Sequence, residues 1–101
     1  MPVAYPVIFT PAARAELIEA QDWYEREAPG LGRRFRQAID ALTERMSSNP
    51  RQFPVVYKNV RRALLRRFPY SLFFVMQDDG TLLVIACFHA SRDPAHWQRR
   101  V

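Results

Sequence analysis

The run VRRALLRRFPYSLFFVMQDDGTLLVIACFH, residues 60–89, decides the fold of this chain. Three stretches rich in β-branched and aromatic residues follow one another in it, which is typical of strands. Phe68-Pro69 separates the first two stretches, and Asp78-Asp79-Gly80, a strong hairpin signal, separates the last two. Strands in series with short turns form an antiparallel meander. The predicted strands are residues 60–67, 70–77 and 82–89.

Both faces of this predicted sheet are largely apolar. Side chains alternate between the faces along a strand, so the last strand offers one set to each face. The two sets are Leu82, Val84, Ala86 and Phe88, and Leu83, Ile85, Cys87 and His89. A helix hairpin covers only one face of a small sheet. The other face needs the C-terminal tail, a second copy or a partner as cover, and the sequence favours the tail and a partner equally.

Two helices are predicted before the meander. Thr10-Pro11 is typical of a helix start, and apolar residues recur at helical spacing as far as about Ala28. A second apolar stripe of the same kind runs over residues 31–48. Only Pro29-Gly30 separates the two stripes, so the helices must fold back on each other as an antiparallel hairpin.

The remaining segments are short. Residues 3–9 favour a strand, which Pro6 either breaks or restricts to a sheet edge. We expect residues 51–59 to form an irregular connection and residues 91–101 to form a tail with one helical turn. The chain shows no repeats and no low-complexity segment, so we expect one domain over residues 1–101.

The charge of the chain indicates its classes of partner. The formal net charge is +5, and Lys58 is the only lysine among 15 basic residues, the others being arginine. The planar guanidinium of arginine pairs with a carboxylate or a phosphate through two hydrogen bonds. The sequence therefore predicts an acidic protein or a nucleic acid as a partner.

Other functional classes find little support in the sequence. Cys87 is the only cysteine, so no disulfide forms within the chain, and we expect a small buried apolar residue there. The two histidines and the cysteine lack metal-ligand spacing, so we expect neither a metal nor a cofactor. No apolar run reaches about 18 residues and no signal-peptide pattern is visible. We expect a cytoplasmic protein with no membrane and no small-molecule ligand.

Four phrases of the sequence occur in an order that resembles a known superfamily. They are PGLGRRF (Pro29 to Phe35), NPRQFPVV (Asn49 to Val56), RRALLRRFPYSLFF (Arg61 to Phe74) and FHASRDPAHW (Phe88 to Trp97). Together they resemble the RelE/ParE superfamily of toxins from type II toxin–antitoxin systems, and in particular its ParE-like branch, the plasmid-stabilisation toxins. The resemblance implies an α+β fold in which an N-terminal strand and an antiparallel helix hairpin pack on an antiparallel β-meander.

The resemblance also implies a toxin that arrests growth until a cognate antitoxin binds it. Such an antitoxin is expected to be acidic and to fold on binding. RelE-like members cut ribosome-bound mRNA without a metal, whereas some ParE-like members poison DNA gyrase and need no known catalytic residues. The sequence favours a gyrase poison. The alternatives are a metal-free mRNA endonuclease, a decayed, non-toxic homologue that still binds its partner, and an unrelated basic nucleic-acid-binding domain.

The candidate site residues differ between these functions. An RNase would use His89 with Arg62, Arg92 and Lys58, because it needs an acid–base group and cations near one phosphate. The chain departs from the RelE pattern, which has several lysines before the meander. Arginine is a poor proton donor, so His89 would carry most of the proton transfer. Binding of a target or antitoxin is expected at Arg61, Arg62, Arg66, Arg67 and Arg92.

Overall fold

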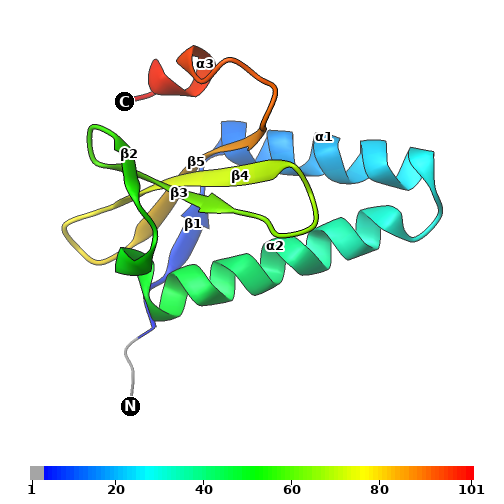
Figure 1. Ribbon diagram of the computed structural model, residues 1–101. Coiled ribbons are helices and arrows are strands. Elements are labelled where there is room, and N and C mark those ends of the chain that lie inside the picture. The colour runs from blue at the N-terminus through cyan, green and yellow to red at the C-terminus, as the bar shows by residue number, and fades with distance from the viewer. Residues whose placement is uncertain (1–3) are drawn as a thin grey trace.

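The computed structural model describes residues 4–101 and places all strands in one sheet of order β1-β5-β4-β3-β2. β1 pairs with β5 in parallel, and the other neighbours are antiparallel. The elements are β1 Val7–Phe9, α1 Pro11–Glu27, α2 Leu31–Ser48, the 3-10 turn η1 Pro50–Gln52, β2 Val55–Tyr57, β3 Val60–Leu64, β4 Tyr70–Met76, β5 Leu82–His89 and α3 Ala95–Gln98. The α1–α2 hairpin lies on one side of the sheet and α3 on the other (Figure 1). The predicted α+β fold is confirmed.

The strands differ in detail from the prediction. β1 begins after Pro6 and lies at a sheet edge, as expected, while residue 3 of the predicted strand lies outside the described residues. Residues 51–59 were expected to be irregular, but they contain η1 and β2. β3 ends at Leu64 rather than at residue 67, and Leu65 N–H donates to the Tyr70 carbonyl to close the turn. Arg66 and Arg67 therefore lie in the β3–β4 turn and not on a strand.

Phe68 explains why β3 ends early. Its ring packs edge-on against Tyr24 of α1 at 4.9 Å and against Phe35 of α2 at 5.2 Å between centroids. Burial of aromatic rings is strongly favourable. These contacts hold the β3–β4 turn against the helix hairpin and out of the plane of the sheet.

The connection between the helices depends on two glycines. Gly30 has a φ of +87°, which other residues rarely adopt. A Cβ atom on Gly32 would lie 2.6 Å from the Gln21 carbonyl oxygen, so only glycine permits this close approach of the helices. The Glu25 carboxylate of α1 accepts hydrogen bonds from Gly30 N–H at 2.9 Å and Gly32 N–H at 3.1 Å. One helix thus caps the start of the next.

A β-bulge in β5 changes the predicted assignment of side chains to faces. Phe73 pairs with Ala86 and the next residue, Phe74, pairs with Val84, so Ile85 is an extra residue. Beyond the bulge, Cys87 packs in the helix-side core and His89 pairs with Tyr70 on that side. The strict alternation predicted for this strand is wrong for its second half. In that half of the strand, Ile85, Ala86 and Phe88 lie on the opposite face of the sheet, called the tail side because the C-terminal tail packs on it.

The C-terminal tail covers the second face of the sheet. Trp97 is buried and stacks on Phe73 with ring centroids 4.2 Å apart, and it meets Tyr57 edge-on at 5.8 Å. The cover is partial, because Leu64 is still 55% exposed and Val56 42% exposed. Of the two kinds of cover that the sequence favoured equally, the tail is thus present within the chain.

Candidate functional site

A basic groove lies between α2 and the β3–β4 turn. Its volume is about 770 Å³. The lining residues are Leu31, Arg34, Gln37, Ala38, Ala41, Leu42, Arg45, Leu64, Leu65, Arg66, Arg67 and Phe68. None of these residues is acidic. Apolar side chains and four arginines therefore share one surface, which suits an amphipathic acidic segment.

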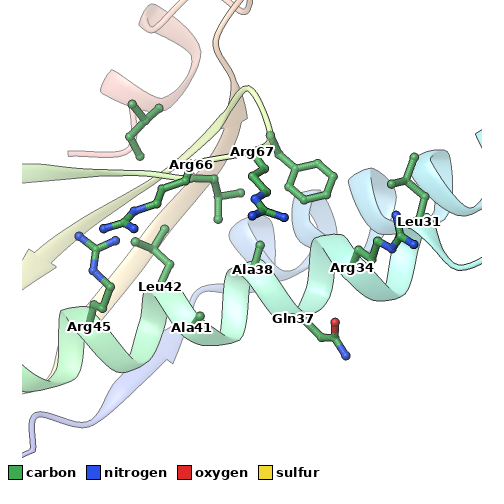
Figure 2. A pocket seen from close by; sticks show the side chains of 12 residues that line it. Leu31, Arg34, Gln37, Ala38, Ala41, Leu42, Arg45, Arg66 and Arg67 are labelled. Carbon is green, nitrogen blue, oxygen red and sulfur yellow. The ribbon is translucent and has the colours of Figure 1, made fainter.

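The arginines of the basic groove come from both of its sides. Figure 2 shows Arg66 and Arg67 extending from the turn toward α2, while Arg45 extends from α2 toward Arg66. Like charges on opposite sides of a groove repel each other unless an anion lies between them. Within the part of the chain that the structure describes, Arg66 and Arg45 form no salt bridge.

Arg66 and Arg67 are among the binding residues expected from the sequence, whereas Arg34 and Arg45 are not. Both missed residues are on α2, three residues after the apolar Leu31 and Leu42. Side chains three apart lie on neighbouring turns of one helix face. Their position beside the apolar stripe of α2 was the only sequence signal for a role in binding. That position does not show that the β3–β4 turn lies opposite α2.

A second, smaller groove lies on the tail side of the sheet. This sheet groove has a volume of about 350 Å³. It is lined by Val56, Arg62, Leu64, Ser71, Phe73, Phe88, His89, Ala90, Arg92, Pro94, Trp97 and Gln98. It brings together Arg62, His89 and Arg92 of the predicted RNase set. Lys58 is not among the lining residues; its ammonium group donates to the Val101 carbonyl at 3.1 Å.

The His89 ring is turned toward the helix side of the sheet. It meets the Tyr70 ring edge-on at 5.1 Å between centroids. Its Nδ1 accepts a hydrogen bond from Ser91 N–H at 3.0 Å and lies 2.8 Å from the Ser91 hydroxyl. Because a backbone N–H only donates, Nδ1 carries no proton, and the neutral ring bears its proton on Nε2. Arg62 pairs with Phe73, which packs in the tail-side core. The side chains of Arg62 and His89 therefore belong to opposite faces.

Two other candidate arginines are held by contacts within the chain. Arg61 donates to the Phe53 carbonyl at 2.7 Å, so it fixes the segment before β2. Arg92 lies 3.7 Å from the Glu16 carboxylate and 3.9 Å from the centre of the Phe88 ring. Glu16 of α1, a residue for which the sequence predicts no role, thus lies beside the candidate site residue Arg92.

Cys87 is a buried free thiol on the helix side. Burial, with a smaller contribution from the charge of Glu16, raises the pKa of the thiol to about 12. A thiol needs deprotonation to act as a nucleophile. Cys87 is therefore inert at neutral pH, as expected for a small core residue.

Residues 4–101 contain neither a metal-binding cluster nor a membrane-spanning helix. No group of three or more His, Cys, Asp or Glu side chains among them is arranged to hold a metal ion. None of the helices in that range has the length and apolar character needed to cross a membrane.

Comparison with solved structures places the fold among known toxin–antitoxin systems. One match is a chain of a chromosomal ParDE toxin–antitoxin system from P. aeruginosa, with a TM-score of 0.74 and 20% identity over 85% of this chain and 96% of that one. Another is from the toxin–antitoxin complex RelBE2 of Mycobacterium tuberculosis, with a TM-score of 0.59 and 23% identity over 86% and 99%. At these identities the two matches show the fold alone.

Comparison of sequences identifies the family. The chain is 29% identical to Toxin ParE2 of Mycobacterium tuberculosis over 80 residues, which are 78% of this chain and 75% of that toxin. The family model described as the ParE toxin of the type II toxin–antitoxin system parDE matches residues 7–94, from β1 to the start of α3. The protein therefore belongs to the ParE family and is a toxin of a type II toxin–antitoxin system.

Proposed function

We propose that this toxin arrests growth by poisoning DNA gyrase in the cytoplasm, and that a cognate antitoxin neutralises it by placing an acidic, amphipathic segment in the basic groove. The observation that supports the antitoxin site is the groove itself, where four arginines surround an apolar floor and no lining residue is acidic. Such a surface steers an acidic partner and offers apolar area for burial.

The dimensions of the groove indicate the size of the segment. Arg34 and Arg45 are 11 positions apart on α2, which corresponds to about 16 Å at 1.5 Å per residue. The small side chains of Ala38 and Ala41 lie between them and permit a close approach. A helical segment of about 11 residues, with acidic side chains near its ends and apolar ones between, satisfies both features. A segment that folds on binding loses conformational entropy, which limits its affinity for a given area.

Charge reversal at the groove tests the antitoxin site. Replacing Arg66 and Arg67 by Glu should lower the association rate constant about tenfold or more and weaken its dependence on salt. The matched control is Arg33→Glu with Arg36→Glu, which makes the same change of net charge on another side of α2. Stopped-flow kinetics with the purified antitoxin at several salt concentrations measure both pairs. Equal slowing by the two pairs would show that net charge, and not this groove, steers the antitoxin.

The geometry of His89 supports gyrase over mRNA as the target. A general base needs a nitrogen without a proton facing the substrate. In His89, Nδ1 is engaged by Ser91 and Nε2 carries the proton, so neither nitrogen is ready to accept one. The ring also faces away from Arg62, one of the two arginines that would bind the phosphate. Poisoning of gyrase requires binding and no proton transfer by the toxin.

The substitution His89→Gln separates the two targets. Gln keeps hydrogen-bonding capacity but cannot transfer a proton at neutral pH. We expect the variant to retain growth arrest and to trap gyrase on DNA in a purified assay as the parent does. Antitoxin binding at unchanged affinity is the control for folding. Loss of toxicity together with loss of mRNA cleavage in a purified translation system, in a variant that binds antitoxin normally, would refute the gyrase assignment.

A metal-free mRNA endonuclease is the second candidate, and one observation favours it. The sheet groove has Arg62 and Arg92 beside aromatic side chains, as a site for single-stranded RNA requires, and His89 also lines it although its ring is turned to the other face. In that case His89→Gln should slow cleavage by about 100- to 10,000-fold. Unimpaired growth at confirmed high expression of the parent chain, with or without its antitoxin, would favour instead a decayed homologue that only binds its partner.

A further inference from the structure

β5 has an open edge over its second half. β1 pairs only with Leu82 to Val84, so no strand among residues 4–101 lies on that side from Ile85 onward. Free backbone groups at a sheet edge readily pair with other strands. Here side chains occupy two of them. Arg100 donates to the Ile85 carbonyl at 2.7 Å, and Cys87 N–H donates to the Glu16 carboxylate at 3.1 Å.

The Glu16 carboxylate joins α1, β5 and the tail. Besides Cys87 N–H, it accepts hydrogen bonds from both terminal nitrogens of Arg100, at 3.1 and 2.8 Å. Arg92 lies 3.7 Å from the same carboxylate. The side chain of Glu16 is only 14% exposed, so solvent screens these contacts less than it screens a surface ion pair. In agreement, the hydrogen bond with Glu16 raises the pKa of Arg100.

Phe88 completes the arrangement around Glu16. The guanidinium carbons of Arg92 and Arg100 lie 3.9 and 5.4 Å from the centre of its ring. Cations over an aromatic face are attracted to it. Two guanidinium groups this close to one ring would repel each other without the shared carboxylate.

We propose that Glu16 is a positioning residue, which holds the C-terminal tail closed over the sheet and fixes Arg92 at the rim of the sheet groove. Opening the tail would expose Phe73 and Phe88, two buried residues of the tail-side core. It would also free the edge of β5. The proposal concerns the chain itself and holds for a gyrase or a ribosomal target, so its failure would leave the proposed function intact.

The test compares Glu16→Gln with the matched control Glu19→Gln in the full chain. Glu19 is one turn away, and within the described residues it forms no ion pair. In Glu16→Gln we expect hydrogen exchange at the Cys87 amide and the tail amides to rise about tenfold or more, because charge-assisted hydrogen bonds are lost. The Arg92 Nε–H NMR signal should move toward its random-coil position. Exchange in α2 should be unchanged in both variants.

A second variant keeps the test decisive if Glu16→Gln fails to fold. Arg100→Gln removes the tail partner and leaves α1 unaltered, so it should loosen the tail to a similar extent. Since the two side chains contact each other, the effect of the double variant should be smaller than the sum of the two single changes. Tail exchange in both single variants equal to that of Glu19→Gln would overturn the proposal, as would simple additivity in the double variant.

Discussion

The two faces of the sheet are built from the same strands but are covered in different ways. On one face lie helices of 17 and 18 residues, and Phe74, Leu72 and Leu82 beneath them are fully buried. On the other lies α3, with four residues, whose main anchor is Trp97. Cover by long helices is shared among many residues, whereas cover by the tail depends on a few. The tail-side face is thus the one that a single substitution can open.

The largest effect is expected on the helix side. Phe74 is fully buried and meets Phe53 edge-on at 6.0 Å. Replacing it by Ala should lower the free energy of unfolding by about 3–5 kcal/mol, because the helices above it cannot move in to fill the cavity. For a domain of this size that loss approaches the whole stability. Urea unfolding followed by circular dichroism measures it, and a loss below about 1 kcal/mol would mean that the face repacks freely.

On the tail side the corresponding change is Trp97→Ala. The substitution should lower the free energy of unfolding by about 3 kcal/mol or less. This loss is smaller than for Phe74→Ala because the tail can detach while the five strands and two helices stay folded. Trypsin should cleave the variant after Arg92 and Arg99 faster than the parent. Equal losses of unfolding free energy in Trp97→Ala and Phe74→Ala would contradict the difference in cover between the two faces.

Alkaline pH should reveal the burial of Cys87 on the helix side. The thiol ionises near 9.0 when exposed, and its pKa is about 12 in the folded protein. A raised pKa gives stability that is present below pH 9 and is lost as the pH rises toward 12. The free energy of unfolding should therefore fall more steeply between about pH 8 and about pH 10.5 in the parent than in Cys87→Ala. Burial also raises the pKa of Tyr24 and Tyr70 in both proteins, but the smaller contribution of Cys87 to the pKa of Tyr70 is present only in the parent.

The smallest effect on stability is expected at Leu64. Its side chain is 55% exposed and lines both the basic groove and the sheet groove. Leu64→Gln should change the free energy of unfolding by less than about 0.5 kcal/mol. It should nevertheless weaken antitoxin binding, measured by isothermal titration calorimetry, because a bound segment would bury this side chain. Unchanged affinity would place the antitoxin elsewhere.

Local signals were enough to predict the elements that depend on neighbouring residues. Asp78-Asp79-Gly80 gave the β4–β5 hairpin, and Pro29-Gly30 gave the turn between the helices. β2 was missed because it has three residues, beginning directly after Pro54, and its pairing partner is β3. The bulge at Ile85 has no glycine or proline to mark it.

The candidate site was predicted less completely, because grooves are formed by residues far apart in sequence. Arg66 and Arg67 were expected to bind a partner, yet their place opposite α2 depends on Phe68 packing between the helices. Arg34 and Arg45 belong to the same groove through that contact. In the sequence, nothing distinguishes Glu16 from a solvent-exposed residue of α1, because its partner Arg100 is in the C-terminal tail.

The bulge bears on how toxins of one fold diverge. Deleting Ile85, a change of one codon, would restore strict alternation along β5. His89 would keep its partner Tyr70 and stay on the helix side, and Phe88 would stay opposite Ser71 on the tail side, because Ile85 is the extra residue of the bulge. A regular strand that kept all eight residues of β5 would instead turn His89 toward the face that carries Arg62 and Phe88 toward α1. The presence or absence of a bulge in a strand of this length thus decides which surface the residues at the end of β5 belong to. An alignment that matches a histidine at the end of this strand without counting the bulge would therefore assign it to the wrong face.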